Sequence, residues 1–358
     1  MQPEKTFPRP LIGKTGWPWN FTPKKISVDF DLPRVTIVTP SYNQAEYLEE
    51  TIRSVLLQSY PNLEYFIMDG GSTDGSVEII KKYEPWLTGW VSEKDNGQSA
   101  AINKGFSKAT GEWLGWLNSD DCFAPDALLK LLKTAHDAQA DFVYGACVQF
   151  GVNPEVQRFP KMKSPGPRAF DSTIITRADF IEQPAALWKR EAYEQYGPLA
   201  EDLRYAFDWD FFIRCAQTSK GASCAQVVAA YRLHANNKSV ELSARDEELI
   251  SVSLKYLPTH LRKKFIRILP VIRLFKKTAI DPSRRRWLTR KIVKLIPLSV
   301  QNYWFRLFTD CRFLRLFGAP LELWAMYVYG GCVDENLVVF KVAATPAYTV
   351  ADSLDLFL

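Results

Sequence analysis

Strand-like and helix-like segments alternate between residues 34 and 146, and this alternation restricts the fold more than any other feature. Four short segments have the continuous hydrophobicity of strands covered on both faces, at 35–39 ("VTIVT"), 63–69 ("LEYFIMD"), 112–118 ("EWLGWLN") and 141–146 ("DFVYGA"). Helical periodicity occupies the intervals, at 48–56, 77–83, 100–106 and 126–136. This order predicts an α/β fold with a mostly parallel sheet and right-handed connections.

The chain on either side of this alternation has a different character. Six prolines within residues 1–33 predict an extended N-terminal arm. Beyond residue 150 the pattern predicts a strand and a short helix at 183–197, a helix at 208–221 that Gly221 ends, and a strand at 224–234. We therefore expect three parts: the arm at 1–33, a sheet domain at 34–240, and a mainly helical region at 241–358.

Length and composition allow a sizeable core, because the 358 residues are 47% hydrophobic, and they exclude a chain that is disordered throughout. The six cysteines form no CxxC pair, and no apolar segment of the signal-peptide kind follows Met1. Neither a zinc ribbon nor a secreted disulfide framework is indicated, and we expect the reducing environment of the cytoplasm.

Two adjacent acids, Asp120 and Asp121, follow a predicted strand in "WLNSDD". Ligands of open α/β sheets bind beyond the carboxyl ends of the strands, so we expect this pair to share one edge with Tyr42 and Asp69. Neighbouring carboxylates repel unless a cation or a shared proton lies between them. Oxygen ligands of this kind suit Mg²⁺ or Mn²⁺, ions that also bind phosphate oxygens. The pair therefore indicates a metal–diphosphate site; the alternative is a strand exit whose acids complement the dipole of the next helix.

Five segments, taken in order, resemble the family 2 glycosyltransferases, which are inverting, nucleotide-sugar-dependent enzymes of GT-A fold. They are "VTIVTPSYNQAEYLEETIRSVLLQSYPNLE", "FIMDGGSTDGS", "SEKDNGQSAAINKGFSKATGE", "WLNSDD" and "FDWDFFIR". The resemblance implies a Rossmann-like, mostly parallel sheet flanked by helices, with a helical basic C-terminal extension. It also implies transfer of a sugar from a nucleoside-diphosphate donor to a saccharide or lipid-linked saccharide, in the assembly of a cell-surface polysaccharide.

The resemblance assigns the donor site residue by residue. Tyr42 matches the aromatic residue that lies against the base, and the alternative for Tyr42 is a core position at a strand end. Asp69 matches the first acid of the family's "DDGSTD", but Gly70 replaces the second acid, so the base is not specified. The alternative for "GGSTDG" is a tight turn that caps a helix. Asp95 matches the acid near the donor sugar or ribose, and the alternative is a surface Asp-Asn-Gly turn. The expected donor-binding set is Pro40, Tyr42, Asn43, Asp69, Gly70, Asp95, Asn103, Lys104, Asn118 and Asp120.

By the same resemblance, Asp121 binds the metal, and Asp120 beside it belongs to the metal site and also contacts sugar or ribose hydroxyls. His234 matches a histidine that completes the metal shell in some family members, and imidazole can bind Mn²⁺. The alternative for His234 is a hydrogen-bonded structural histidine. The expected cofactor is Mn²⁺ or Mg²⁺, which acts as a Lewis acid on the departing diphosphate.

An inverting displacement needs a base that takes the proton of the acceptor hydroxyl. "AFDWDFF" supplies Asp208 and Asp210, and Asp208 matches the Asp of the family's "ED" pair, whose Glu is here Phe207. We expect Asp208 to be the base; the alternative is that both acids cap the helix that follows. Trp209 is expected to line the acceptor pocket, since the C–H faces of sugars pack on aromatic rings.

The segment from Lys255 to Arg315 contains 17 Lys or Arg and only two acids, interleaved with apolar and aromatic residues. Such a pattern is typical of helices that lie on an anionic membrane surface, and no apolar stretch is long enough to span a bilayer. A solvated helical face and nucleic-acid binding are the alternatives, of which nucleic acid is not expected. We expect a cytoplasmic protein, peripheral at the inner face of the cell membrane.

Two other functions compete with the transferase. A non-catalytic nucleotide-sugar-binding or membrane-tethered scaffold would keep the fold and lose the chemistry. A sugar-phosphate nucleotidyltransferase would need a Gly-rich, basic phosphate loop after the first strand, and "TPSYNQAEY" has neither glycine nor a basic residue.

Overall fold

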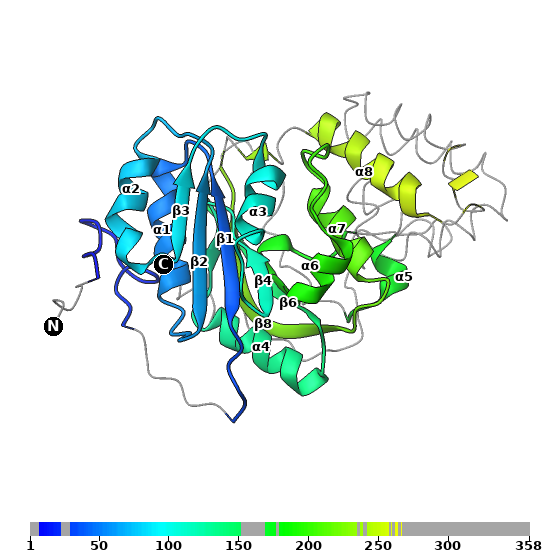
Figure 1. Cartoon of the computed structure of the whole chain (residues 1–358), viewed down its shortest axis with the longest axis horizontal. Coiled ribbons are helices and arrows are strands. Elements are labelled where there is room, and N and C mark those ends of the chain that lie inside the picture. Colours follow the sequence, from blue (N-terminus) through cyan, green and yellow to red (C-terminus); the bar gives the residue numbers. More distant parts are fainter. Residues whose placement is uncertain are drawn as a thin grey trace, which may run out of the picture. The chain divides into compact units, whose positions relative to one another are not determined.

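The computed structural model describes residues 7–22, 29–151, 169–176, 179–234, 237–238, 242–257, 259, 262–263 and 266 (Figure 1). These residues divide into two compact units. The first runs to Ser172 and continues from Ile181 to Glu248, and it holds all the predicted site residues. The second contains Thr173–Phe180 and the residues from Leu249 onward.

The first unit is built on a mixed sheet whose strands, in the described residues, are arranged in the order β3-β2-β1-β4-β7-β6-β8-β5. The bounds are β1 Val35–Ser41, β2 Leu63–Asp69, β3 Gly89–Ser92, β4 Trp113–Trp116, β5 Cys122–Phe123, β6 Phe142–Phe150, β7 Ala186–Lys189 and β8 Gly221–Arg232. Strands β1, β2, β3 and β4 are parallel to one another, and β6 is parallel to β8. Strand β7 runs antiparallel to both β4 and β6, and β5 runs antiparallel to β8. The α/β class is confirmed, and the sheet is more mixed than the mostly parallel one expected.

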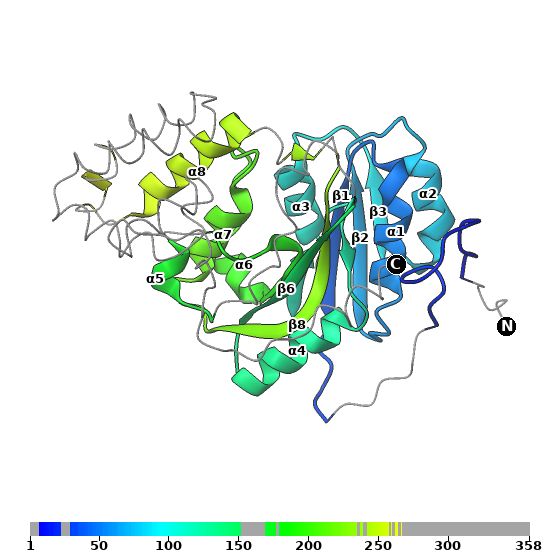
Figure 2. The same cartoon turned by 180° about the vertical axis from the view of Figure 1, so that it is seen from behind.

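The helices occupy the intervals that the periodicity predicted. Their bounds are α1 Ala45–Leu56, α2 Ser76–Tyr83, α3 Gln98–Phe106, α4 Ala127–Ala138, α5 Ser172–Ile175, α6 Arg190–Tyr196, α7 Phe207–Cys215 and α8 Leu242–Tyr256, with short 3₁₀ turns at Glu84–Trp86 and Gln183–Ala185. Helices α1 and α2 pack side by side (Figures 1 and 2). Helix α7 ends earlier than predicted, and Gly221 begins β8 instead of ending the helix.

The core is centred on β1, whose residues are all buried. Val35, Ile37 and Val38 have no exposed surface, which is the environment that a continuous apolar run requires. Helix α3 packs closely on this strand at Gly105, where a Cβ atom would lie 2.5 Å from Val38 Cγ1. Only glycine allows that approach, so the helix that carries Gln98 is held tightly against the central strand.

A second, aromatic cluster lies between the sheet and helices α3 and α7. The rings of Trp116 and Trp188 are 5.3 Å apart at a steep angle, and Phe106, Phe207 and Phe212 surround Trp116 at 5.9 to 6.4 Å. Edge-to-face pairs of this kind add to the free energy gained by burying the rings. The cluster fixes α7 on the sheet, and it takes up Phe207 as a core residue.

The start of α1 is capped by residues that are distant in the sequence. Asn43 has a left-handed backbone (φ 51°) and makes no side-chain cap to the helix, although its spacing from Glu46 resembles a capping box. Instead, the amide of Ala45 donates to Asp74 Oδ2 at 2.9 Å, and that of Gln44 donates to Ser76 Oγ at 3.1 Å. The "GGSTDGS" turn therefore holds the exit of β1.

The N-terminal arm is packed on α1 through one buried cation. Arg53, 2% exposed, donates to the carbonyls of Pro8, Pro18 and Trp19 at 2.8 to 3.2 Å and to Tyr83 Oη at 2.9 Å. Its guanidinium also lies 5.2 Å from the centre of the Trp19 ring. A buried cation is tolerated only when its donors are satisfied, so the arm and Arg53 depend on one another.

The arm also touches the strand that follows the acid pair. Trp17 is 6% exposed, and its Nε1 donates to the carbonyl of Phe123 at 2.7 Å. The described part of the arm is therefore folded onto the sheet domain and supports β5 from outside.

The second unit is represented mainly by the last two turns of α8. Leu249, Ile250, Val252 and Leu257 are buried there. Most of the basic region from Lys255 to Arg315 lies outside the described residues. Within the described part of the chain, no helix combines the length and apolarity needed to cross a membrane.

Replacing Arg53 with Met should lower the free energy of unfolding by about 3 kcal/mol, because three buried carbonyls lose a charged donor. Release of the arm should also make residues 7–22 sensitive to limited proteolysis. Urea unfolding and a proteolysis time course measure both effects. Arg34→Met, which removes an exposed arginine at the start of β1, is the matched control and should change little; equal effects of the two substitutions would contradict the role of Arg53.

Candidate functional site

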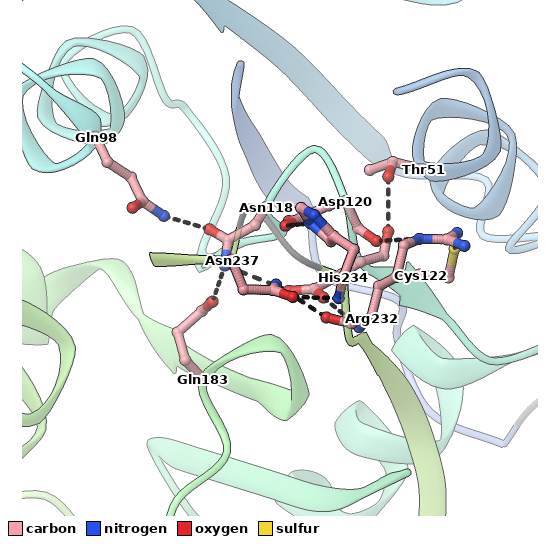
Figure 3. A network of polar contacts seen from close by, with 10 residues as sticks. Thr51, Gln98, Asn118, Asp120, Cys122, Gln183, Arg232, His234 and Asn237 are labelled. Carbon is pink, nitrogen blue, oxygen red and sulfur yellow. Dashed lines mark hydrogen bonds and ion pairs between the residues drawn. The ribbon is translucent and has the colours of Figure 1, made fainter. Parts of the chain in front are cut away.

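The carboxyl ends of β1, β2 and β4 meet the end of β8 at one rim of the sheet, and the acid pair lies there. Figure 3 shows the side chains of the β4 exit loop and of the β8 exit gathered into a single polar network. Three segments that are far apart in sequence contribute to it, around Thr51, Asn118 and Arg232. The predicted convergence of strand ends is therefore present.

Asp121 is turned into the protein and has no exposed surface. Its Oδ1 accepts the backbone N–H of Arg232 at 2.9 Å, and its Oδ2 accepts from Asn118 Nδ2 at 3.3 Å. Burial, and then the charge of Asp120, raise the pKa of Asp121 well above its ordinary value. As placed, this carboxylate joins the β4 exit to the end of β8 and offers no surface to an ion.

Asp120 points the other way, toward His234. Its Oδ2 lies 2.9 Å from His234 Nε2, and its side chain is 17% exposed. The backbone N–H of His234 donates to Asn237 Oδ1, and Asn237 Nδ2 donates to the carbonyl of Arg232 at 3.0 Å. This tight turn after β8 fixes the imidazole opposite Asp120, so the two adjacent acids have separate tasks.

Arg232 is a central residue that the sequence analysis did not select. Its Nε donates to the carbonyl of Asp120 at 2.8 Å, and its Nη2 pairs with Glu50 Oε2 at 3.1 Å. The guanidinium lies 4.9 Å from the Tyr47 ring centre and 4.2 Å from that of Phe150. The sequence feature that could have predicted Arg232 is its position two residues before His234, because side chains at this spacing lie on one face at the end of the strand.

One face of α1 holds the backbone that follows the acid pair. Thr51 Oγ1 donates to the carbonyl of Asp121 at 2.7 Å, and Ser54 Oγ accepts from the N–H of Phe123 at 3.1 Å. One turn further on, Gln58 Nε2 donates to the carbonyl of Ala124 at 2.9 Å. The hydroxyl groups of Thr51 and Ser54 on α1, and the amide of Gln58 just after the helix, are therefore buried because they hold this backbone.

Two amides flank Asn118 and extend the network. Gln98 Nε2 donates to Asn118 Oδ1 at 2.6 Å, and Asn118 Nδ2 lies 3.3 Å from Gln183 Oε1 (Figure 3). Gln183 Nε2 in turn donates to the carbonyl of Trp116 at 2.8 Å. Neither glutamine was predicted: Gln98 lies in a quoted family segment but was given no role there, and Gln183 lies outside all five segments.

The exits of β1 and β2 form the neighbouring part of the rim. Tyr42 is 62% exposed, so the core interpretation of this residue is wrong and its ring is accessible. Asp69 is buried and accepts from the N–H groups of Gly71 and Ser72 and from the hydroxyls of Ser72 and Ser92, all within 2.5 to 3.1 Å. Asp69 therefore stabilises the turn, which the capping interpretation also proposed.

Asp95 faces the space that Gly70 leaves open. A Cβ atom at Gly70 would lie 2.9 Å from Asp95 Oδ2, so a side chain at position 70 would require the Asp95 carboxylate to shift. Asp95 Oδ1 accepts the N–H of Gly97 at 2.8 Å, as in an Asp-Asn-Gly turn. The turn uses Asp95 Oδ1, while Asp95 Oδ2 faces Gly70. Asp95 therefore holds the turn and also supplies an acid at the corner where Gly70 has none.

Other members of the expected donor set have partners within the protein. Asn103 uses all its hydrogen-bonding positions on Tyr193, Leu199 and Glu201, at 2.9 to 3.1 Å. Lys104 forms an ion pair with Glu93. Pro40 is buried in β1, and Asn43 Oδ1 accepts the N–H of Thr73 at 2.9 Å. These residues shape the loops of the rim, and Asn103 has no free group for a ligand.

Helix α7 separates the two acids of "FDWDFF". Asp210 is 1% exposed and pairs with Arg214 Nε at 2.9 Å, so it is part of a buried ion pair. Trp209 has no exposed surface, and the prediction that its ring lines an acceptor pocket is wrong, because the helix turns it into the aromatic core. Asp208 is only half-buried. Burial, and the charges of Glu182 and Glu248, raise the pKa of Asp208 to about 6.

The described residues contain no cluster of three or more His, Cys, Asp or Glu side chains that could hold a metal ion. Asp120 Oδ2 and His234 Nε2 nevertheless meet at one point, and a carboxylate oxygen with an imidazole nitrogen is a donor pair that Mn²⁺ accepts. His234 Nδ1 is buried with no hydrogen-bond partner in this part of the chain. The pair fits an ion that takes its remaining ligands from phosphate oxygens.

The separate tasks of the two acids can be measured. Asp121→Ala should lower the free energy of unfolding by about 3 kcal/mol, because the buried Arg232 N–H and Asn118 amide lose their acceptor. Asp120→Ala should cost at most about 1 kcal/mol, since its side chain is partly hydrated and, among the described residues, its carboxylate bonds His234 alone. Urea unfolding of the two variants compares them directly; a larger loss for Asp120→Ala would contradict the assignment.

Comparisons with known proteins agree with this geometry. Residues 36–197 match the family described as Glycosyl transferase family 2. The putative teichuronic acid biosynthesis glycosyltransferase TuaG of Bacillus subtilis is 36% identical over 115 residues, which are 31% of this chain and 46% of TuaG. The chain thus spans less than half of that relative's length. A PGL/p-HBAD biosynthesis glycosyltransferase of Mycobacterium bovis is 29% identical over 188 residues, or 51% of this chain and 70% of the relative.

Solved structures show the same fold at low sequence identity. The mannosyltransferase PcManGT from Pyrobaculum calidifontis, in complex with GDP-Man and Mn²⁺, superposes with a TM-score of 0.52 at 19% identity, covering 87% of this chain and 91% of that one. Staphylococcus aureus TarS 1-349 in complex with UDP gives a TM-score of 0.50 at 18% identity, covering 83% and 86%. The mixed sheet, its flanking helices and the matched segment lead to one conclusion: residues 36–197 of this chain match glycosyl transferase family 2, and the sheet domain has the GT-A fold.

Proposed function

We propose that this glycosyltransferase is an inverting enzyme that moves a sugar from a nucleoside-diphosphate donor to a saccharide or lipid-linked saccharide acceptor. The observation that carries the proposal is the meeting of Asp120 and His234 at the rim where the strands end. Relatives named for teichuronic acid and PGL biosynthesis support a role in making a cell-surface polymer.

The donor nucleoside would occupy the corner formed by Tyr42, Gly70 and Asp95. The exposed ring of Tyr42 offers a face on which a base stacks, and Asp95 Oδ2 is an acceptor for ribose or base donors. Asp69 would act indirectly, because its oxygens already hold the turn. The geometry is compatible with any of several bases, and Gly70 with Asp95 replaces the usual pair of acids.

The diphosphate would lie beside Asp120 and His234. These two residues would hold Mn²⁺ or Mg²⁺, which, when bound, neutralises the charge that grows on the diphosphate as the glycosidic bond breaks. Asp121 and Arg232 keep Asp120 in place from behind. Asn118 would stay in place between Gln98 and Gln183, because its side-chain amide is hydrogen-bonded to both.

Asp208 would be the base. Phe207, in the position of the family's Glu, is 5% exposed, and Asp210 is paired with Arg214, so Asp208 is the acid of this helix with a reachable oxygen. It would take the proton of the acceptor hydroxyl while that oxygen bonds the anomeric carbon and the diphosphate leaves from the opposite face. One displacement inverts the configuration and needs no covalent intermediate. A pKa near 6 leaves Asp208 ionised at neutral pH and basic enough to accept a proton.

The basic segment from Lys255 to Arg315 extends the proposal to location. Its cations, interleaved with apolar residues, would hold the protein on the anionic inner surface of the cell membrane, where lipid-linked acceptors are found. This part of the proposal rests on the sequence alone, because the segment lies largely beyond the described residues.

The experiment that tests the function compares Asp208→Asn with Asp202→Asn, an exposed acid of the preceding loop. Asp208→Asn should lower kcat by about 10² to 10⁴-fold and leave nucleoside-diphosphate binding unchanged, since it removes only the base. In the unaltered protein, kcat/KM should rise with pH up to about pH 6 and then level off, because Asp208 must lose its proton to act.

The control Asp202→Asn should keep both turnover and binding. Full turnover by Asp208→Asn would contradict the proposed mechanism. An unaltered protein that binds nucleotide sugars but never transfers the sugar would instead be the non-catalytic scaffold. A rate that falls as the pH rises through 6 would show that Asp208 acts as an acid instead.

A further inference from the structure

The helix that carries Asp208 begins at a residue that cannot cap it. Helix α7 has Ala206 in its N-cap position, and this residue makes no side-chain hydrogen bond to the helix. Alanine is a poor N-cap, because it offers no acceptor to the N–H groups that have no partner within the helix. Asp208 is the second residue of α7, so its position depends on what holds the residues just before the helix.

Glu248, on α8, supplies an acceptor at this end of α7. Its Oε1 accepts the backbone N–H of Arg204 at 2.9 Å, and its Oε2 accepts those of Tyr205 and Ala206 at 2.6 and 3.1 Å. One carboxylate thus binds three consecutive N–H groups, and its charge complements the dipole of α7. Glu248 and the loop before α7 belong to the first compact unit, so these contacts lie within that unit.

The loop between α6 and α7 is fixed at its other end as well. The N–H of Leu199 donates to Asn103 Oδ1 at 2.9 Å, and Arg214 Nη2 donates to the carbonyl of Pro198 at 3.0 Å. Loss of the Glu248 carboxylate would therefore loosen the end of the loop that adjoins α7 and leave its start in place.

Two acids from other elements place negative charge near Asp208. They are Glu248 and Glu182, which directly precedes the 3₁₀ turn at Gln183–Ala185. Burial, the largest cause, and these two charges raise the pKa of Asp208 to about 6, against the N–H of Trp209, which donates to Asp208 Oδ1 at 2.7 Å. A like charge near a carboxylate favours its protonated form, and so makes the ionised form a stronger base.

The other charged residues of α7 and of the loop before it are paired with one another or exposed to water. Asp210 pairs with Arg214 Nε at 2.9 Å, so these two charges offset each other. Water and salt screen the exposed charges of the loop, which are Glu201, Asp202 and Arg204. On α8, Glu247 is exposed and Arg245 lies one turn before Glu248. Glu248 thus combines a charge near Asp208 with three hydrogen bonds to the backbone that leads to it.

We propose that Glu248 is the positioning residue of the base: it holds the start of α7 in place and faces Asp208 with a like charge. The inference deepens the proposed function and rests on it, because it assumes that Asp208 takes the proton of the acceptor hydroxyl. Glu248 acts through Asp208 and not on the substrate. The hydrogen bonds keep the base where the acceptor needs it, and the charge strengthens it.

The charge is tested by titrating Asp208 directly. Carbon-13 NMR of protein labelled in the aspartate carboxyl groups follows this titration, and the signal missing from Asp208→Asn identifies the residue. In the unaltered protein the midpoint should lie near pH 6. Glu248→Gln should lower it by about half a pH unit or more, because a charge that favours the protonated form is gone. Glu248→Asp keeps the charge and should leave the midpoint nearly unchanged.

The hold on the helix is tested by turnover. The release of UDP or GDP from UDP-glucose, UDP-GlcNAc and GDP-Man is followed with Mn²⁺ present, and kcat is expressed per protein molecule that binds the nucleoside diphosphate. Glu248→Asp should lower kcat by about 10-fold, because its shorter side chain cannot reach all three N–H groups, and should leave nucleoside-diphosphate binding unchanged. Amide hydrogen exchange at residues 204–206 should become faster in the same variant.

Glu247→Gln, which alters the exposed neighbour of Glu248 on α8, is the matched control and should keep both the Asp208 midpoint and kcat. An unchanged midpoint in Glu248→Gln, or an unchanged kcat in Glu248→Asp, would overturn this inference alone. Full turnover by Asp208→Asn, or an unaltered protein that releases no nucleoside diphosphate from any of the three donors, would overturn the proposed function, and this inference with it.

Discussion

The site depends on one buried hydrogen bond, from the backbone N–H of Arg232 to the carboxylate of Asp121. It joins the exit of β4 to the end of β8, two segments 111 residues apart that are not neighbours in the sheet. Two like charges can adjoin in the chain because one is buried, with a raised pKa, and the other remains at the surface. The arm, through Trp17 and Phe123, and the polar face of α1, through Thr51, hold the same backbone from the other side.

Local sequence predicts much of the fold, but it does not predict the direction in which the side chains of the site point. The alternation of apolar runs with helical periodicity predicted β2 at its observed bounds and β1 nearly so. The strands β3 and β5 were missed, because β3 is not a continuous buried apolar run and β5 has only two residues. The mixed pairing depends on β7, whose direction is set by contacts with β4 and β6 and leaves no local signal.

The sequence analysis predicted the candidate site as a set of motifs. The structure buries some of the predicted residues and adds others that were not predicted. Asp121, Asp210 and Trp209 were all expected to take part in the site, yet all three are buried, because their direction depends on β8 and on the aromatic core. Conversely, Arg232 and Gln183 lie outside the quoted segments, and Gln98 was given no role within its segment, yet all three matter through contacts with residues distant in sequence. Gly70 and Phe207, the two departures from the family pattern, fit their surroundings: one makes room for Asp95, and the other fills the core beside Trp116.

The most direct measurement is a crystal structure of the chain with Mn²⁺ and a nucleoside diphosphate. The account predicts an ion in contact with Asp120 Oδ2, His234 Nε2 and phosphate oxygens, while Asp121 still accepts the N–H of Arg232. An ion on the oxygens of Asp121, with its bond to Arg232 broken and Asp120 turned away, would contradict it.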